Sequence, residues 1–207
     1  MAVYYIDPTY TGSPQNGAFS SPYSDWSTPT ISDSNSYLGK EGTTWTSGTS
    51  GISLQASNVI LGTYDSVTGE QVYDVARRHK MDFSSCTDAQ CIGISSTASP
   101  LSETGNLIIN LHIVGSNTTD GISISDGVDN TTIKYCRLVG TGSSATSQND
   151  GILHNGGFPI IFNNNEILKF NAGIRSTTDA ANNSVSTDYS TIANNNIYNL
   201  DGTTASD

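Results

Sequence analysis

Four polar residues recur at one position of a repeated six-residue unit, and their types could do chemistry on a charged sugar. They are the fifth residues of four units, spaced by 25, 29 and 30 residues along the chain: His112, Arg137, Glu166 and Asn196. Side chains alternate between the two faces of a strand, so units set in register place these four on one outward column, about 5 Å apart. Lys134 precedes Arg137 by three residues, and we expect it on the same strand.

This column suggests the β-elimination of a uronide. In that reaction a base removes the proton at C5 while a cation neutralises the sugar carboxylate. The candidate catalytic residues are therefore His112, Lys134, Arg137 and Glu166, with Asn196 as a substrate contact. The alternative is a surface ion-pair ladder of Arg137 over Glu166, worth less than about 1 kcal/mol and unrelated to catalysis.

A second set of polar residues stands where two Gly-Ile strands begin. Asp120 precedes Gly121, Asp150 precedes Gly151, and His154 follows in the second strand. These three are candidate substrate contacts, although carboxylates one repeat apart would be closer than the roughly 6.5–9.5 Å that inverting hydrolysis needs. The alternative is that the aspartates cap turns before glycines of positive φ, and that His154 points inward as a hydrogen-bonded core residue.

Metal and cofactor binding rest on fewer residues. Asp120, Asp126, Asp129 and Asp150 form an oxygen-rich cluster that can bind Ca²⁺, and a solvated acidic rim is the alternative. No nucleotide-binding motif occurs and no Cys/His pairs stand at zinc spacing, so no other cofactor or metal ligand is expected. Cys86 and Cys91 could form a disulfide or remain two thiols, and Cys136 is expected to be buried.

Internal repeats indicate which elements would hold these side chains. The six-residue units are interleaved with a second series of short strands, each beginning Gly-Ile, at positions 51, 93, 121, 151 and 173. Short strands that recur every 22–30 residues, without a helical period, favour a solenoid of stacked parallel sheets. The fourth residues of the last two units are Asn165 and Asn195, and we expect their amides to hydrogen-bond in a ladder.

The Gly-Ile strands, the Ile-x-x-Asn-x-Ile units and the asparagine ladder resemble right-handed parallel β-helix proteins of the pectate-lyase-like superfamily. Residues 4–8 resemble the opening segment of that group, and residues 42–45 with 52–64 resemble its first coil. Residues 117–122 are similar to a stretch of its pectin-hydrolysing members, whose Asp-Asp, Gly-His-Gly and Arg-Ile-Lys motifs are absent here. The resemblance implies an all-β fold, a right-handed parallel β-helix solenoid of about five or six coils with an N-terminal cap.

The expected organisation is an opening segment and cap over residues 1–50, followed by β-helix coils over residues 51–207 with an excursion near residues 65–91. Trp26, Tyr37 and Trp45 would cover the first coil. The last coil has no closing element, so we expect the stack to continue in a longer chain or to pack on a partner.

Composition narrows the classes of partner. The 207 residues carry 8 basic and 19 acidic side chains, for a net charge of −11, and only 13% of residues are charged. This balance argues against nucleic acid and anionic membrane surfaces as partners. No apolar run approaches the ~20 residues of a membrane span, and the first eight residues lack the pattern of a signal peptide.

Two hypotheses of function stay open at this point. The first is a polysaccharide lyase or glycoside hydrolase, secreted or carried on a virus particle, that acts on an acidic glycan. The second is a non-catalytic structural or adhesion protein, such as a phage tailspike-like component, that forms a homo-oligomer as a trimer or end to end. Both imply a polysaccharide partner and an extracellular or virion-surface location.

Overall fold

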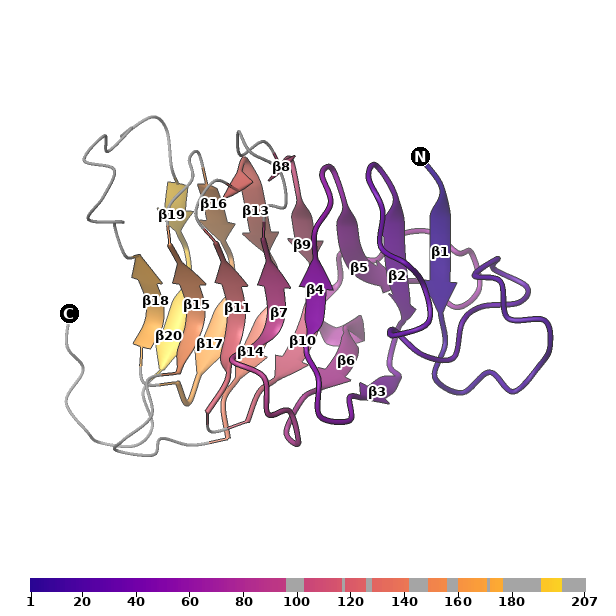
Figure 1. The fold of residues 1–207 in the computed structure, drawn as a ribbon, viewed down its shortest axis with the longest axis horizontal. Helices are drawn as coiled ribbons and strands as arrows, with labels where there is room; N and C mark the ends of the chain where they lie inside the picture. Colours follow the sequence, from indigo (N-terminus) through magenta and orange to yellow (C-terminus); the bar gives the residue numbers. More distant parts are fainter. Residues whose placement is uncertain are drawn as a thin grey trace.

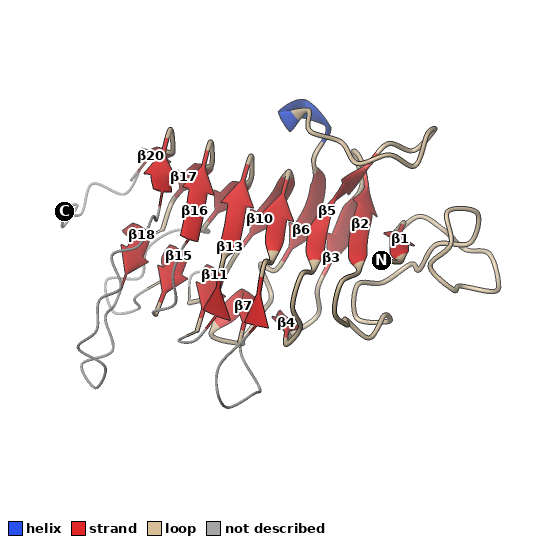
Figure 2. Ribbon diagram, turned by 90° about the horizontal axis from the view of Figure 1, so that it is seen from above, coloured by secondary structure: helices blue, strands red, loops and turns tan. Residues whose placement is uncertain are grey.

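The computed structural model describes residues 1–95, 103–116, 118–125, 128–141, 149–155, 160–170, 172–176 and 191–198. The fold is all-β apart from one short 3₁₀ turn, η1 (Val75–Arg77), which projects from the side of the strands in Figure 2. No helix within these ranges is long and apolar enough to cross a membrane.

Three parallel sheets contain nearly all of the described strands. Sheet 1 contains β1 (Val3–Ile6), β2 (Ser36–Lys40), β5 (Ile60–Tyr64), β9 (Leu107–Ile109), β13 (Thr131–Lys134), β16 (Ile160–Asn163) and β19 (Thr191–Ala193). Sheet 2 contains β3 (Thr44–Thr46), β6 (His79–Asp82), β10 (Leu111–Val114), β14 (Arg137–Val139), β17 (Glu166–Leu168) and β20 (Asn196–Tyr198). Sheet 3 contains β4 (Ile52–Leu54), β7 (Gln90–Ile94), β11 (Asp120–Ile124), β15 (Asp150–His154) and β18 (Ala172–Ser176). A small parallel pair joins β8 (Glu103–Thr104) to β12 (Val128–Asp129).

The chain visits the three sheets in the same order again and again. From β2 to β18 it passes from sheet 1 to sheet 2 to sheet 3, and each repeat adds one strand to each sheet. Figure 1 shows these strands side by side along the long axis, from β1 near the N-terminus to β18 and β20 near the other end. Equivalent side chains of successive repeats therefore lie next to one another.

The six-residue units are corners rather than single strands. Their third residues have left-handed backbone torsions: Asn110 at φ 54°, Tyr135 at 57°, Asn164 at 56° and Asn194 at 55°. Asparagine adopts this conformation more readily than most residues, which accounts for three of the four positions. The prediction that Lys134 and Arg137 share a strand is wrong, because the corner at Tyr135 places Lys134 on β13 and Arg137 on β14.

The predicted asparagine ladder is present at this corner. The Asn165 amide nitrogen donates to Asn195 Oδ1 at 3.0 Å and to the Ile133 carbonyl at 2.9 Å. Asn165 Oδ1 in turn accepts from the backbone N–H of Cys136 at 3.0 Å. The ladder satisfies buried backbone groups that the left-handed corner would otherwise leave without partners.

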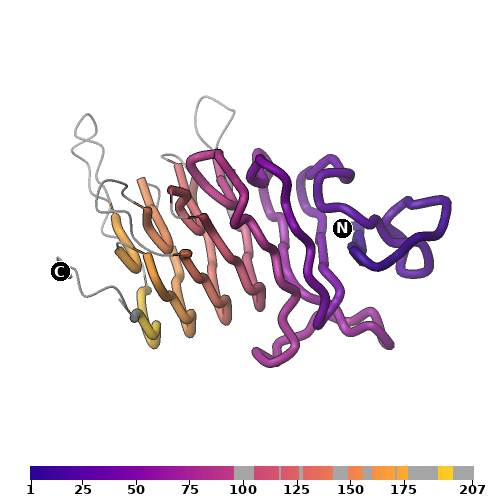
Figure 3. The backbone as a smooth tube through the Cα atoms, turned by 90° about the horizontal axis from the view of Figure 1, so that it is seen from below, coloured from indigo at the N-terminus to yellow at the C-terminus, as the bar shows by residue number. Residues whose placement is uncertain are grey.

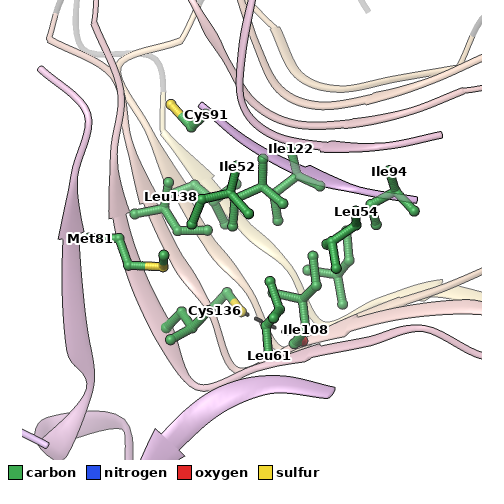
Figure 4. Close-up of a cluster of buried hydrophobic side chains, with 14 of the residues drawn as sticks. Ile52, Leu54, Leu61, Met81, Cys91, Ile94, Ile108, Ile122, Cys136 and Leu138 are labelled. Carbon is green, nitrogen blue, oxygen red and sulfur yellow. Dashed lines mark hydrogen bonds between the residues drawn. The ribbon is translucent and has the colours of Figure 1, made fainter. Parts of the chain in front are cut away.

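The core lies between the three sheets. Figure 4 shows inward side chains from all of them meeting there, among them Leu61 of β5, Ile122 of β11 and Leu138 of β14. Burying each such side chain contributes about 1.5–3 kcal/mol relative to leaving it in water. Cys86, Cys91 and Cys136 are buried free thiols. Of the two alternatives for Cys86 and Cys91, the structure therefore has two thiols and no disulfide between them.

The sheets reach further toward the N-terminus than the expected boundary at residue 51. β1, β2 and β3 pair in register with the later strands, and Figure 3 shows the N-terminal segment, in indigo, forming the end of the stack opposite the yellow strands. Trp26, Tyr37 and Trp45 are buried there. The expected excursion near residues 65–91 is shorter than anticipated, because residues 79–82 form β6 within sheet 2.

Candidate functional site

The predicted outward column exists on sheet 2. His112 pairs with Arg137, Arg137 with Glu166, and Glu166 with Asn196, in parallel register. The neighbouring residues Ile113, Leu138 and Ile167 point into the core, which leaves the column on the outer face. The sheet thus brings together four residues that are separated by 25 to 30 positions in the sequence.

Two further cations join this column, and the sequence reasoning missed both. Lys80 of β6 pairs with His112, one repeat before it. Arg78 stands just before β6, and its Nε donates to the carbonyl of Tyr135 at 2.9 Å, directly before the strand that carries Arg137. The sequence contained a signal for Lys80, because His79-Lys80 aligns with Leu111-His112. That signal was missed because these residues fall in the segment that was expected to leave the sheets.

We call Arg78, Lys80, His112 and Arg137 the cationic column. It holds three of the chain's eight lysines and arginines, on a protein whose net charge is −11. Burial lowers the pKa of Arg78, which means that its half-buried charge lacks full compensation. An anionic ligand placed here would supply that compensation.

Arg137 makes only a loose ion pair. Its Nε lies 3.4 Å from Glu166 Oε2, and the two side chains are 43% and 34% exposed. Within the described part of the chain that Nε has no hydrogen-bond acceptor. The contact therefore leaves this Nε, itself buried, without an acceptor, whereas Lys80 is held more closely by Asp82 at 2.9 Å.

His112 is the titratable group at the centre of the column. Burial lowers its pKa to about 4, and the charges of Arg137, Lys80 and Arg78 act in the same direction. Its ring makes no hydrogen bond to any of the residues that the structure describes. At neutral pH the imidazole is therefore uncharged, as a general base must be, although burial and the nearby cations make it a weaker base than a free histidine.

Lys134 is not brought into this column. It lies on sheet 1, where it pairs with Ile109 on one side and Asn163 on the other. Asn196 lies at the far end of the described column, exposed and two repeats beyond Arg137. Of the predicted residues, His112, Arg137 and Glu166 are the ones that the structure places next to one another.

The aspartates of sheet 3 lie in a different environment. Asp120 Oδ1 accepts the backbone N–H of Asp150 at 2.8 Å, and Asp150 Oδ2 lies 2.5 Å from an Arg175 nitrogen. The two aspartates are only 8% and 1% exposed. Burial raises the pKa of Asp120 to about 6, and it raises that of Asp150 against the opposing charge of Arg175.

We call Asp120, Asp150 and Arg175 the buried aspartate group. Its contacts fit the alternative in which the aspartates have a structural role and accept backbone N–H groups. One part of that alternative, the positive φ of the glycine that follows, is wrong. Gly121 does not have the positive φ that the turn interpretation required. Glycine is needed there because a Cβ would lie 2.6 Å from the carbonyl oxygen of Gly151 on the next strand.

His154, predicted as a substrate contact, points into the core. It is fully buried, its Nδ1 lies 3.2 Å from Ser176 Oγ, and its ring packs edge-on against Phe162. This is the inward histidine that the strand alternation allowed. A substrate outside the sheets would not reach it.

The oxygen-rich cluster suggested for Ca²⁺ is not assembled by the residues that are described. Asp126 lies outside them, and Asp150 is occupied by Arg175. Across the described ranges no three His, Cys, Asp or Glu side chains are placed to hold a metal ion.

No protein-family model, curated protein or solved structure matches the chain. Function is therefore inferred from the arrangement of its side chains.

Proposed function

We propose that this protein binds an acidic polysaccharide along the cationic column, outside the cell or on the surface of a virus particle. We further propose that the three sheets are the faces of a right-handed parallel β-helix of the pectate-lyase-like kind. The repeated passage through the same three sheets supports the solenoid. The right hand is the one that crossovers between parallel strands almost always take.

The observation that carries this proposal is the gathering of Arg78, Lys80 and Arg137 beside a neutral histidine on an otherwise acidic protein. Guanidinium and ammonium groups bind carboxylates through charge-assisted hydrogen bonds. Successive strands stand about 4.8 Å apart, so an extended chain of uronic acids would meet cations two repeats apart, at Arg78 and Lys80 and again at Arg137, with the neutral His112 between them. A neutral glycan would gain nothing from this charge.

The same arrangement supports a β-elimination. Arg137 and Arg78 would neutralise the carboxylate of a uronide, which makes the proton at C5 more acidic. The imidazole of His112 would take that proton, and its electron pair would form the C4–C5 double bond. The bond from C4 to the glycosidic oxygen would break, and that oxygen would take a proton from water.

The test is a pair of measurements on one set of variants. Binding of polygalacturonate and alginate is followed by affinity electrophoresis with neutral dextran as the comparison, and cleavage by the ultraviolet absorbance of the unsaturated product. Arg137→Gln should weaken binding about tenfold. The matched control is Lys169→Gln, which removes the same charge from an exposed lysine outside the column.

Each outcome is informative. Binding with cleavage would establish a lyase, and binding without cleavage would favour the adhesion hypothesis. Equal affinity for dextran and the acidic glycans, or an equal loss in the Lys169 variant, would refute the proposal.

A further inference from the structure

A second site is built into the N-terminal end of the stack, away from the cationic column. A cavity of about 460 Å³ lies between the segment around Asp25 and Trp26 and the loop that joins β3 to β4. Its volume falls within the range of small-molecule sites in proteins. We call it the cap cavity.

The inner wall of the cap cavity is aromatic and held rigidly. Trp26 and Trp45 line it, and they are only 2% and 8% exposed. The Trp45 indole N–H donates to Asp25 Oδ1 at 3.1 Å, and the Trp26 indole N–H donates to His79 Nε2 at 3.0 Å. Both rings are thus fixed before any ligand arrives, which lowers the entropic cost of binding.

The outer rim is a loop of small hydroxyl-bearing residues that is also fixed. The Ser47 N–H donates to the Asp82 carbonyl, the Thr87 N–H to the Thr49 carbonyl, and the Gly51 N–H to Asp88 Oδ2. The backbone is therefore anchored to the next repeat along its length. Thr46, Thr49, Ser50 and Ser53 line the cavity, and their side-chain hydroxyls make no hydrogen bond to other described residues.

We propose that the cap cavity binds a neutral sugar ring. The small exposed part of the two indoles suits C–H groups of such a ring, while the rim hydroxyls and Asp25 Oδ2, which accepts no bond from the described residues, suit its hydroxyl groups. Asp25 disfavours a uronate or a phosphate by charge. A wholly apolar ligand would leave the carboxylate and the hydroxyls without water or partners.

The protein carries its own probe for this site. Trp26 and Trp45 are the two tryptophans of the chain, and both line the cap cavity. Titration of the intact protein with methyl glycosides of glucose, galactose, mannose and N-acetylglucosamine should give a saturable change in tryptophan emission for at least one of them. Asp25→Asn keeps an oxygen acceptor for Trp45 and should weaken that response about tenfold.

A size series at Gly48 tests the location. Gly48 lines the cavity, and a Cβ added there would meet no heavy atom within 4 Å. Gly48→Ala should keep the emission response and Gly48→Leu should abolish it, with thermal unfolding and polygalacturonate binding unchanged in both. The proposal is wrong if no glycoside gives a saturable change, or if Gly48→Leu responds like the wild type. Loss of polygalacturonate binding alone would count against the cationic column and leave the cap cavity untouched.

Discussion

The cationic column and the buried aspartate group are both lines of charged residues that run across successive repeats, yet they lie in opposite environments. On sheet 2 the charges point outward, and the ion pair of Arg137 with Glu166 is loose and part-exposed. On sheet 3 the carboxylates are buried and held by backbone N–H and Arg175 at short distances. A repeated charge therefore indicates register, whereas burial separates the charges that are paired within the fold from those that stay open to solvent.

The largest expected effect is on chemistry at the column. If the proposed β-elimination takes place at the column, His112→Gln should reduce cleavage of an acidic polysaccharide by about 100-fold or more, because it removes the neutral base of the column. Binding should persist, since Arg78 and Arg137 remain. Cleavage is measured by the ultraviolet absorbance of the unsaturated product, and binding is measured by affinity electrophoresis. Unchanged cleavage in this variant would remove His112 from the mechanism.

The next effect is on stability, and it separates the two regions. Asp150→Ala should lower the free energy of unfolding by about 2–3 kcal/mol, because it removes a buried carboxylate that pairs with Arg175. Arg137→Ala on the exposed column should cost less than about 1 kcal/mol. Urea unfolding of both variants measures the difference. Similar losses would mean that the column is as structural as the aspartates.

The pH dependence of stability should have opposite signs in the two regions. The pKa of His112 is about 4 in the fold against 6.5 unfolded, so the unfolded chain binds protons first and stability falls as pH drops from about 6.5 to about 4. The pKa of Asp120 is about 6 against 3.8, so the folded state keeps its proton longer and stability falls as pH rises from about 4 to about 6.

Variants separate the contributions of His112 and Asp120 to the pH dependence of stability from the contributions of other titratable groups. His79 is buried with a pKa of about 4 and contributes in the direction of His112, so only differences between variant and wild type are informative. His112→Gln should flatten the loss at low pH, and Asp120→Asn should flatten the loss at rising pH. Unfolding free energies between pH 4 and 7 test both, and slopes of the same sign would contradict the assignment.

The smallest effect expected is the coupling between Arg137 and Glu166. A double-mutant cycle with alanine at both positions should give a coupling below about 1 kcal/mol, because the pair is part-exposed and its closest contact is 3.4 Å. A coupling well above that would favour the ion-pair ladder over a ligand site.

The repeat spacing predicted the sheet register correctly because equivalent residues of successive repeats must pair. His112, Arg137, Glu166 and Asn196 fall on one line as expected. The asparagine ladder was predictable for the same reason, since Asn165 and Asn195 occupy equal positions in their units.

What the sequence could not provide was the path between strands. A left-handed residue turns the chain at Tyr135, and nothing in that residue type marks it, so Lys134 was placed on the wrong strand. The contacts of Asp150 with Arg175 and of Arg78 with Tyr135 join residues 25 and 57 positions apart. Such contacts depend on side-chain reach across repeats, which spacing alone does not encode.

The three buried thiols can report local opening of the fold, because a reagent reaches them only when the structure around them opens. Burial raises the pKa of Cys91 to about 12 and that of Cys136 to about 11, so neither reacts readily with an alkylating reagent while the fold is closed. Cys91 lies on β7 of sheet 3, and Cys136 at the corner between sheets 1 and 2. Their alkylation rates, measured by mass spectrometry, would therefore give the frequency of local opening around each of these two positions.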